Sequence, residues 1–322
     1  MLLVNLLARI IELALISLGL GMFASWTWTI HRLVLGPTLW PQIEPRIGRW
    51  HFATVGRVIA LYFLTRLMVE LGYFQIFAVP PDEKISPTVL IGLVTVVNAS
   101  CLVMVPLGLL ARDRARLSLL IWNGASPGHR IRQGVLTALL AAPVAYFCQF
   151  LAIMIWKPTE HPLSGMLRDG FGFVAGSLAF ISAVLLAPAM EELLFRGFLL
   201  HWLTPSLPEE PGIVVEEEVQ VAREDDIANV CEPLASPPLR PRGFLSWESL
   251  LPNVAVSVAF AGMHAAQWPA PVPLFILSMA FGWLFQRTGS LGAVVVAHAT
   301  FNSISTLGMI YSMLRGFEII PK

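Results

Sequence analysis

Charged side chains are scarce in this chain of 322 residues. Only 13% of its residues are Asp, Glu, Lys or Arg, whereas 56% are hydrophobic, and its mean hydropathy is +0.70. A soluble globular domain carries charge on about a quarter of its residues. The composition therefore excludes an ordinary soluble domain and indicates a multi-pass membrane protein.

Four further deficits narrow the possible classes of protein. The formal net charge is zero, so no basic excess points to nucleic acid as a partner. The three cysteines, Cys101, Cys148 and Cys231, form no CxxC pair, which argues against a disulfide framework and a thiolate metal site. No internal repeat is visible, which weighs against transporter folds built from duplicated halves. The first apolar run lacks a basic start and a clear cleavage site, so we expect it to be a retained anchor.

Long apolar windows dominate the rest of the sequence. A membrane-spanning helix needs about 20 mostly apolar residues, and about eight windows of this kind can be drawn. The sequence thus predicts an all-α, polytopic transmembrane helical bundle, and if the protein is bacterial we expect it in the plasma (inner) membrane. The predicted spans are residues 13–30, 55–79, 89–111, 135–156, 171–202, 250–266, 271–285 and 291–314.

Two hydrophilic segments interrupt these windows. Residues 112–132 carry five arginines against one acid, which predicts a short cytoplasmic loop that contacts anionic lipid. Its charged residues are Arg112, Asp113, Arg114, Arg116, Arg130 and Arg132. Residues 204–247 are acidic and rich in proline, which is typical of a long extramembrane loop.

Charge also appears inside the fifth apolar window. Glu191, Glu192 and Arg196 directly follow the apolar run 171–186. Ionisable side chains are costly at membrane depth, so a functional site is the default hypothesis. Glu192 and Arg196 have the spacing and order of a helical ion pair, which leaves Glu191 without an obvious partner. Pro188 removes a backbone donor just before Glu191 and predicts a distortion of this long helix.

Two later windows add polar side chains at helical spacing. His264 follows Phe260 by four residues, and Asn302 follows His298 by four, so each pair shares one helical face. A carboxylate shielded from water suits a general base, imidazole can share the water or protonate a leaving amine, and a carboxamide can donate to an oxyanion. Alternatively, Glu191, His264 and His298 are three ligands of a zinc ion. Spacing alone leaves both alternatives open.

The three motifs, taken in order, carry a family resemblance. The sequence resembles the CAAX prenyl protease and bacteriocin-processing family of intramembrane proteases, also called the Abi family. That resemblance implies that Glu191 is the catalytic base and His264 its partner, and that His298 and Asn302 bind the water or the oxyanion. The family is described both as zinc-dependent and as metal-independent, so Zn²⁺ stays open. The motifs are EExxxR at Glu191, Glu192 and Arg196, FxxxH at Phe260 and His264, and HxxxN at His298 and Asn302.

The resemblance also implies a domain organisation and a function. Residues 171–322 would form the catalytic core, interrupted by the loop at 204–247, behind N-terminal helices at 1–170 that carry no recognised motif. The expected activity is an intramembrane endopeptidase acting on a membrane protein or a lipidated peptide. Two other functions use the same features: a proton-coupled transporter with the same buried Glu and His set, and a non-catalytic membrane scaffold.

Overall fold

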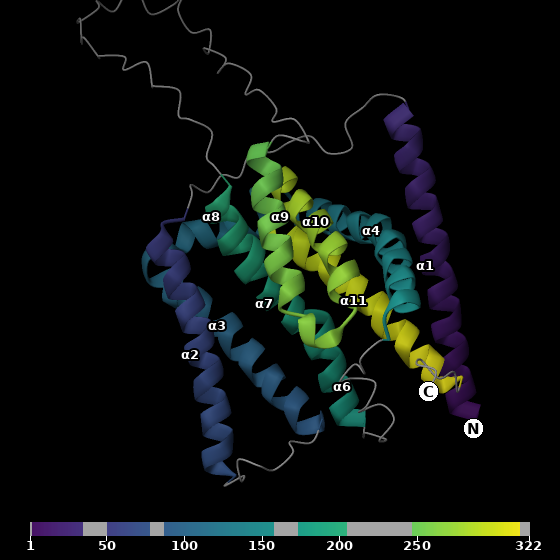
Figure 1. The fold of residues 1–322 in the computed structure, drawn as a ribbon, viewed down its shortest axis with the longest axis horizontal. Helices are drawn as coiled ribbons and strands as arrows, with labels where there is room; N and C mark the ends of the chain where they lie inside the picture. Colours follow the sequence, from purple (N-terminus) through teal and green to yellow (C-terminus); the bar gives the residue numbers. More distant parts are fainter. Residues whose placement is uncertain (1, 35–49, 78–86, 158–172, 205–246, 316–322) are drawn as a thin grey trace, which may run out of the picture.

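The computed structural model describes residues 2–34, 50–77, 87–157, 173–204 and 247–315. Every regular element within these ranges is helical (Figure 1), which confirms the all-α bundle. Six of the helices are long and apolar enough to cross a membrane. These six stretches are Asn5–Arg32, Phe52–Ile76, Val89–Leu107, Pro127–Ile155, Gly176–Leu203 and Leu291–Ser312.

The remaining two predicted spans correspond to shorter helices, so the total of about eight spans stays a prediction. The predicted acidic loop lies, apart from its two end residues, outside the described part of the chain. The helices follow one another along the chain in three groups. The first four are α1 (Leu2–Val34), α2 (Phe52–Ile76), α3 (Pro87–Trp122) and α4 (Pro127–Ile155). A continuous helical run comes next, made of α6 (Phe173–Ile181), η1 (Ser182–Leu186), α7 (Ala187–Glu192), η2 (Leu193–Leu200) and α8 (His201–Leu203). The last helices are α9 (Trp247–Gly262), α10 (Pro271–Thr288) and α11 (Leu291–Leu314).

The basic segment at 112–132 is mostly helix, so the prediction of a loop along its whole length is wrong. α3 continues as far as Trp122. The break follows where Asn123 and Gly124 adopt positive φ angles of 47° and 71°, a conformation that Gly and Asn tolerate best. α4 then begins with Pro127, because Ser126 caps its first turn. The helix continues through the arginines because arginine is a good helix former, and it ends only at Asn123 and Gly124.

Arg130 is buried within the protein instead of facing lipid. Its side chain donates to the carbonyl of Trp122 over 3.2 Å and to the amide oxygen of Gln133 over 2.9 Å. It is completely shielded from solvent, so it ties the end of α3 to the start of α4. Contact between the other arginines and anionic lipid stays a prediction.

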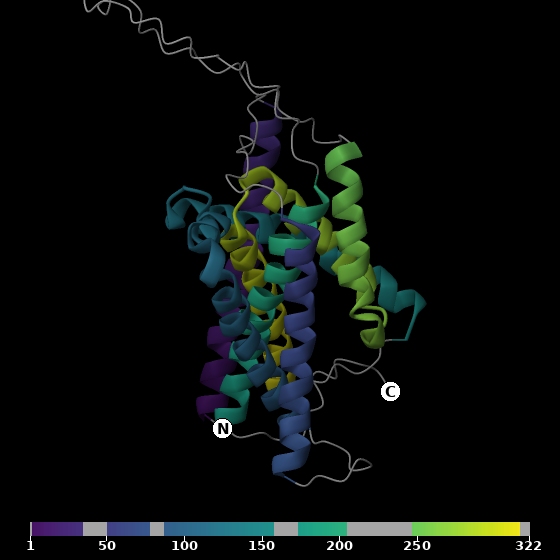
Figure 2. The same ribbon diagram turned by 90° about the vertical axis from the view of Figure 1, so that its left-hand side faces the viewer.

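α11 lies in the middle of the bundle, and the two views in Figures 1 and 2 show other helices on several of its sides. It packs on α4, α1, α10 and α3, and also on the run that carries the EExxxR motif. α4 and α11 lie close together at Gly134, where an added Cβ would collide with the carbonyl of Ala293. Small residues allow such close contacts between helices in membranes. This packing brings His298 and Asn302 of α11 against the continuous run from α6 to α8, which carries the EExxxR motif and is called the motif helix below.

Candidate active site

Glu191 and Glu192 lie between two π-helical turns of one continuous helical run. The turns are η1 (Ser182–Leu186) and η2 (Leu193–Leu200). A π turn widens the backbone and shifts the hydrogen-bond register, and it is often found at functional sites. The sequence predicted a distortion at Pro188. Pro188 lies in the short helix α7, and the distortion is present as two widened turns, one on each side of this helix.

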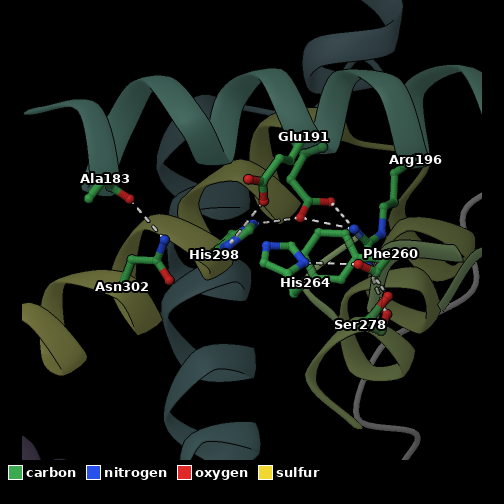
Figure 3. A network of polar contacts seen from close by, with 9 residues as sticks. Ala183, Glu191, Arg196, Phe260, His264, Ser278, His298 and Asn302 are labelled. Atoms are coloured by element: carbon green, nitrogen blue, oxygen red, sulfur yellow. Dashed lines mark hydrogen bonds and ion pairs between the residues drawn. The ribbon is translucent and has the colours of Figure 1, made fainter. Parts of the chain in front are cut away.

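Each widened turn has a backbone carbonyl bound by a side chain from another part of the chain. Asn302 of α11 donates from Nδ2 to the carbonyl of Ala183 over 2.8 Å (Figure 3). Trp50 donates from Nε1 to the carbonyl of Gly197 over 2.8 Å and is almost fully buried. Sequence reasoning missed Trp50, because nothing in its local sequence marks it. Both contacts hold the section that carries Glu191 in place.

His298 contacts both glutamates through its two ring nitrogens, and Figure 3 shows it facing Glu191. Its Nδ1 lies 2.7 Å from Oε1 of Glu192, and its Nε2 lies 3.8 Å from Oε2 of Glu191. The side chains of His298 and Glu192 are buried, whereas that of Glu191 is 27% exposed. An ionised Glu192 accepts the proton of Nδ1, so Nε2 presents its lone pair on the side of Glu191. The sequence had paired His298 with Asn302 and did not foresee this contact with Glu192.

Glu192 also forms the predicted ion pair with Arg196. Nη1 of Arg196 lies 3.0 Å from Oε2 of Glu192, and both side chains are fully buried. Nη2 of Arg196 donates to the carbonyl and the hydroxyl of Ser278, over 3.0 and 2.6 Å. The guanidinium also sits 4.9 Å from the ring centre of Phe260, a cation–π contact. A buried charge needs this many partners to offset its desolvation, so Arg196 ties the motif helix to α9 and α10.

His264 lies just beyond the end of its helix, whereas the sequence predicted a span over residues 250–266 that includes it. α9 ends at Gly262, and His264 lies in the turn that follows, half-buried. Its Nδ1 is 2.9 Å from the carbonyl of Phe260, and the two rings are 5.1 Å apart between centroids. The phenyl ring of Phe260 also lies 5.9 Å from the ring of His298. Phe260 thus contacts both imidazoles and forms part of the cavity wall.

One cavity of about 300 Å³ collects the predicted catalytic residues. Its lining includes Glu191, His264, His298 and Asn302, with Phe260 as part of its apolar wall. Asn302 has one N–H engaged with Ala183, so its second N–H and its carbonyl are left for the cavity. The arrangement suits activation of a small polar molecule beside Glu191.

A zinc ion fits these side chains poorly in this arrangement. Three or more protein ligands are the rule for zinc, at about 2.0–2.3 Å. Among the residues that the structure describes, no group of three His, Cys, Asp or Glu side chains is placed to hold a metal ion. Glu191 and His298 are close to each other, and the bond from Nδ1 of His264 to a backbone carbonyl leaves Nε2 as a possible ligand atom, but the three side chains are not grouped around one point. We therefore derive no catalytic step through a metal.

The fold and the site together define an integral membrane protein with a buried carboxylate–imidazole centre. The family model described as type II CAAX prenyl endopeptidase Rce1-like matches residues 173–304. That range contains all three motifs and confirms the resemblance to the CAAX prenyl proteases. The match points to a CAAX-type intramembrane endopeptidase. No curated protein and no solved structure matches the chain.

Proposed function

We propose that this protein is an intramembrane endopeptidase in which Glu191 and His298 activate a water molecule. The observation that supports this most directly is the 3.8 Å separation between Oε2 of Glu191 and Nε2 of His298 in a shared cavity. With Nδ1 donating to Glu192, both facing atoms are hydrogen-bond acceptors. Two acceptors at this separation are complemented by one water that donates a hydrogen to each.

The water oxygen then attacks the carbonyl carbon of the scissile peptide bond as its proton passes to Glu191. The negative charge that develops on the carbonyl oxygen needs a donor, and the second N–H of Asn302 and the imidazole of His264 are the candidates that line the cavity. Collapse of the tetrahedral intermediate breaks the C–N bond, and the proton held by Glu191 goes to the leaving amine. Glu192 keeps His298 in the required tautomer throughout.

The test compares peptide termini in membranes from cells that make the natural protein or the Glu191→Gln variant at equal abundance. Gln preserves the size of the side chain but cannot accept the proton, so we expect every terminus that the protein generates to disappear. Glu70→Gln is the matched control, because Glu70 is a glutamate of α2 that does not line the cavity. Termini that persist in Glu191→Gln would sink the proposal. A proton-linked solute flux that is lost in the same variant would instead support the transporter alternative.

Metal dependence is tested on the purified protein. Water activation by Glu191 and His298 predicts that cleavage survives a strong chelator and does not rise when zinc is added. Loss of cleavage on chelation, with recovery on adding zinc, would assign Glu191, His264 and His298 as zinc ligands after a rearrangement of His264.

A further inference from the structure

Part of the cavity wall comes from α4, which lies outside the residues matched by the family model. Ala145, Tyr146 and Gln149 of this helix line the cavity. They share one face of α4, because residues three or four positions apart are neighbours on a helix surface. The shape of this part of the cavity is therefore set by a helix that precedes the three motifs.

Tyr146 lies at the end of the cavity away from Glu191. His298, Asn302 and Ser305 line the cavity as a row on one face of α11, and Figure 3 shows the first two. His298 contacts Glu191 at one end of this row, and Ser305 contacts Tyr146 at the other. Seven residues of helix separate the two ends by roughly 10 Å. An extended peptide advances about 3.3–3.6 Å per residue, so Tyr146 would meet the second or third residue from the scissile bond.

Tyr146 is held in place at both its hydroxyl and its ring. Its hydroxyl lies 2.9 Å from Oγ of Ser305. Ser305 donates its own hydrogen to the carbonyl of Phe301 over 3.2 Å, so Tyr146 is the donor in the contact with Ser305. The ring stacks on that of Phe301, with 5.2 Å between the centroids and 21° between the planes. Two contacts with α11 therefore fix the ring, and a fixed wall excludes an oversized side chain because a packed interior resists overfilling.

We propose that Tyr146 is a specificity-determining residue, which closes this end of the cavity and limits the size of the substrate side chain two or three residues from the scissile bond. This inference rests on the proposed endopeptidase function and adds a substrate preference, for a small or medium-sized apolar side chain at that position. Phe301 and Leu274 line the same cavity and suit an apolar group. One methylene more or less in such a pocket changes kcat/KM about 10-fold to 200-fold, so the size of the wall should have a measurable effect.

The test uses the purified full-length protein and a peptide that spans the strongest Glu191-dependent cut. The peptide is made with Ala or Trp at each of the three positions on either side of the cut, one position at a time. The Ala and Trp versions compete in one mixture, so the ratio of their kcat/KM values does not depend on how much of a variant is folded. Tyr146→Ala opens the end of the cavity and should shift this ratio toward Trp at least about tenfold, at the second or third position on one side of the cut.

Two further variants separate the size of the ring from its other contributions. Tyr146→Phe keeps the ring and its stack on Phe301 but loses the bond to Ser305. Its ratio should stay within about threefold of the natural value, even if the loss of the bond lowers thermal stability. Phe147→Ala is the matched control, because Phe147 is the next aromatic residue of α4 and is 61% exposed on the surface of the bundle. Its ratio should equal that of the natural protein.

The outcomes distinguish this inference from the function on which it rests. An unchanged ratio in Tyr146→Ala, with or without a general loss of cleavage, would overturn the specificity role and leave the proposed function intact. An equal shift in Tyr146→Phe would assign the selection to the hydroxyl and overturn the size limit. The absence of any Glu191-dependent cut would overturn the proposed function and this inference with it.

Discussion

α1 and the motif helix are about equally apolar, but a much larger share of the motif helix is buried inside the protein. The mean hydropathy is 1.9 for Asn5–Arg32 and 1.8 for Gly176–Leu203, yet 11% of the first window and 44% of the second are buried inside the protein. Large side chains of α1 such as Leu20 and Phe23 are exposed on the surface of the bundle. Lipid solvates such side chains as well as a protein interior does. Hydropathy therefore reports compatibility with a membrane and does not identify the functional core.

The buried polar groups mark that core instead. Glu192, Arg196 and His298 are each almost completely shielded, and Glu192 bonds to both of the others. Glu12 of α1, in contrast, pairs at the surface with Arg9 and Arg315. Surface pairs contribute little to stability, whereas removal of one partner from a buried pair is severe. The two regions should therefore respond very differently to the same kind of substitution.

The largest effect is expected for Glu192→Gln, compared with Glu12→Gln on α1. The first change replaces the charged acceptor of His298 Nδ1–H by a neutral amide, which can also turn its NH2 toward the ring, and it removes the counter-charge of Arg196. Cleavage should therefore fall at least about a hundredfold and the free energy of unfolding by about 3–5 kcal/mol. Glu12→Gln removes one partner of a surface ion pair, so cleavage and the free energy of unfolding should change only slightly. Peptide-terminus analysis and thermal unfolding in detergent measure the two. Full activity in Glu192→Gln would contradict the role given to the His298–Glu192 contact.

An intermediate effect is expected for Gly134→Ala, compared with Gly19→Ala. An added Cβ at Gly134 meets the carbonyl of Ala293 where α4 and α11 cross, whereas at Gly19 of α1 it meets nothing within 4 Å. Overpacking should lower the free energy of unfolding by about 1–3 kcal/mol in Gly134→Ala, and Gly19→Ala should be neutral. Thermal unfolding of both purified variants is the measurement. Equal stability would mean that α4 and α11 can separate without cost.

The smallest effect is expected for Trp50→Phe, compared with Trp26→Phe on α1. Phe keeps the ring contact with Phe198 but loses the hydrogen bond to the carbonyl of Gly197, which contributes about 0.5–1.5 kcal/mol. We expect kcat to fall a few-fold with KM little changed, because the bond positions the helix of Glu191 and does not bind substrate. Trp26→Phe should have no effect. A change in KM alone would argue that Trp50 contacts the substrate.

Much of the site was predictable from spacing along single helices. The ion pair of Glu192 and Arg196, the contact of Phe260 with His264, and the grouping of the motif residues in one cavity all follow from i,i+4 positions and the cost of polar groups in an apolar run. The roles assigned to the individual residues stay predictions. Spacing predicted the contact of His264 but not its place in the turn after α9, and the density of arginines did not reveal that α3 extends to Trp122 or that Arg130 is buried.

The sequence by itself determined that this is an all-α membrane protein with a polar centre built from three motifs, because hydropathy and helical periodicity are local properties. Only the tertiary structure decided that His298 bonds to Glu192, that Trp50 and Asn302 bind carbonyls of the widened turns, and that Tyr146 and Gln149 complete the cavity. Each of these contacts joins residues distant in the chain. They depend on which faces of the helices meet, and in a membrane that choice is made by close packing and by the need to satisfy buried polar groups.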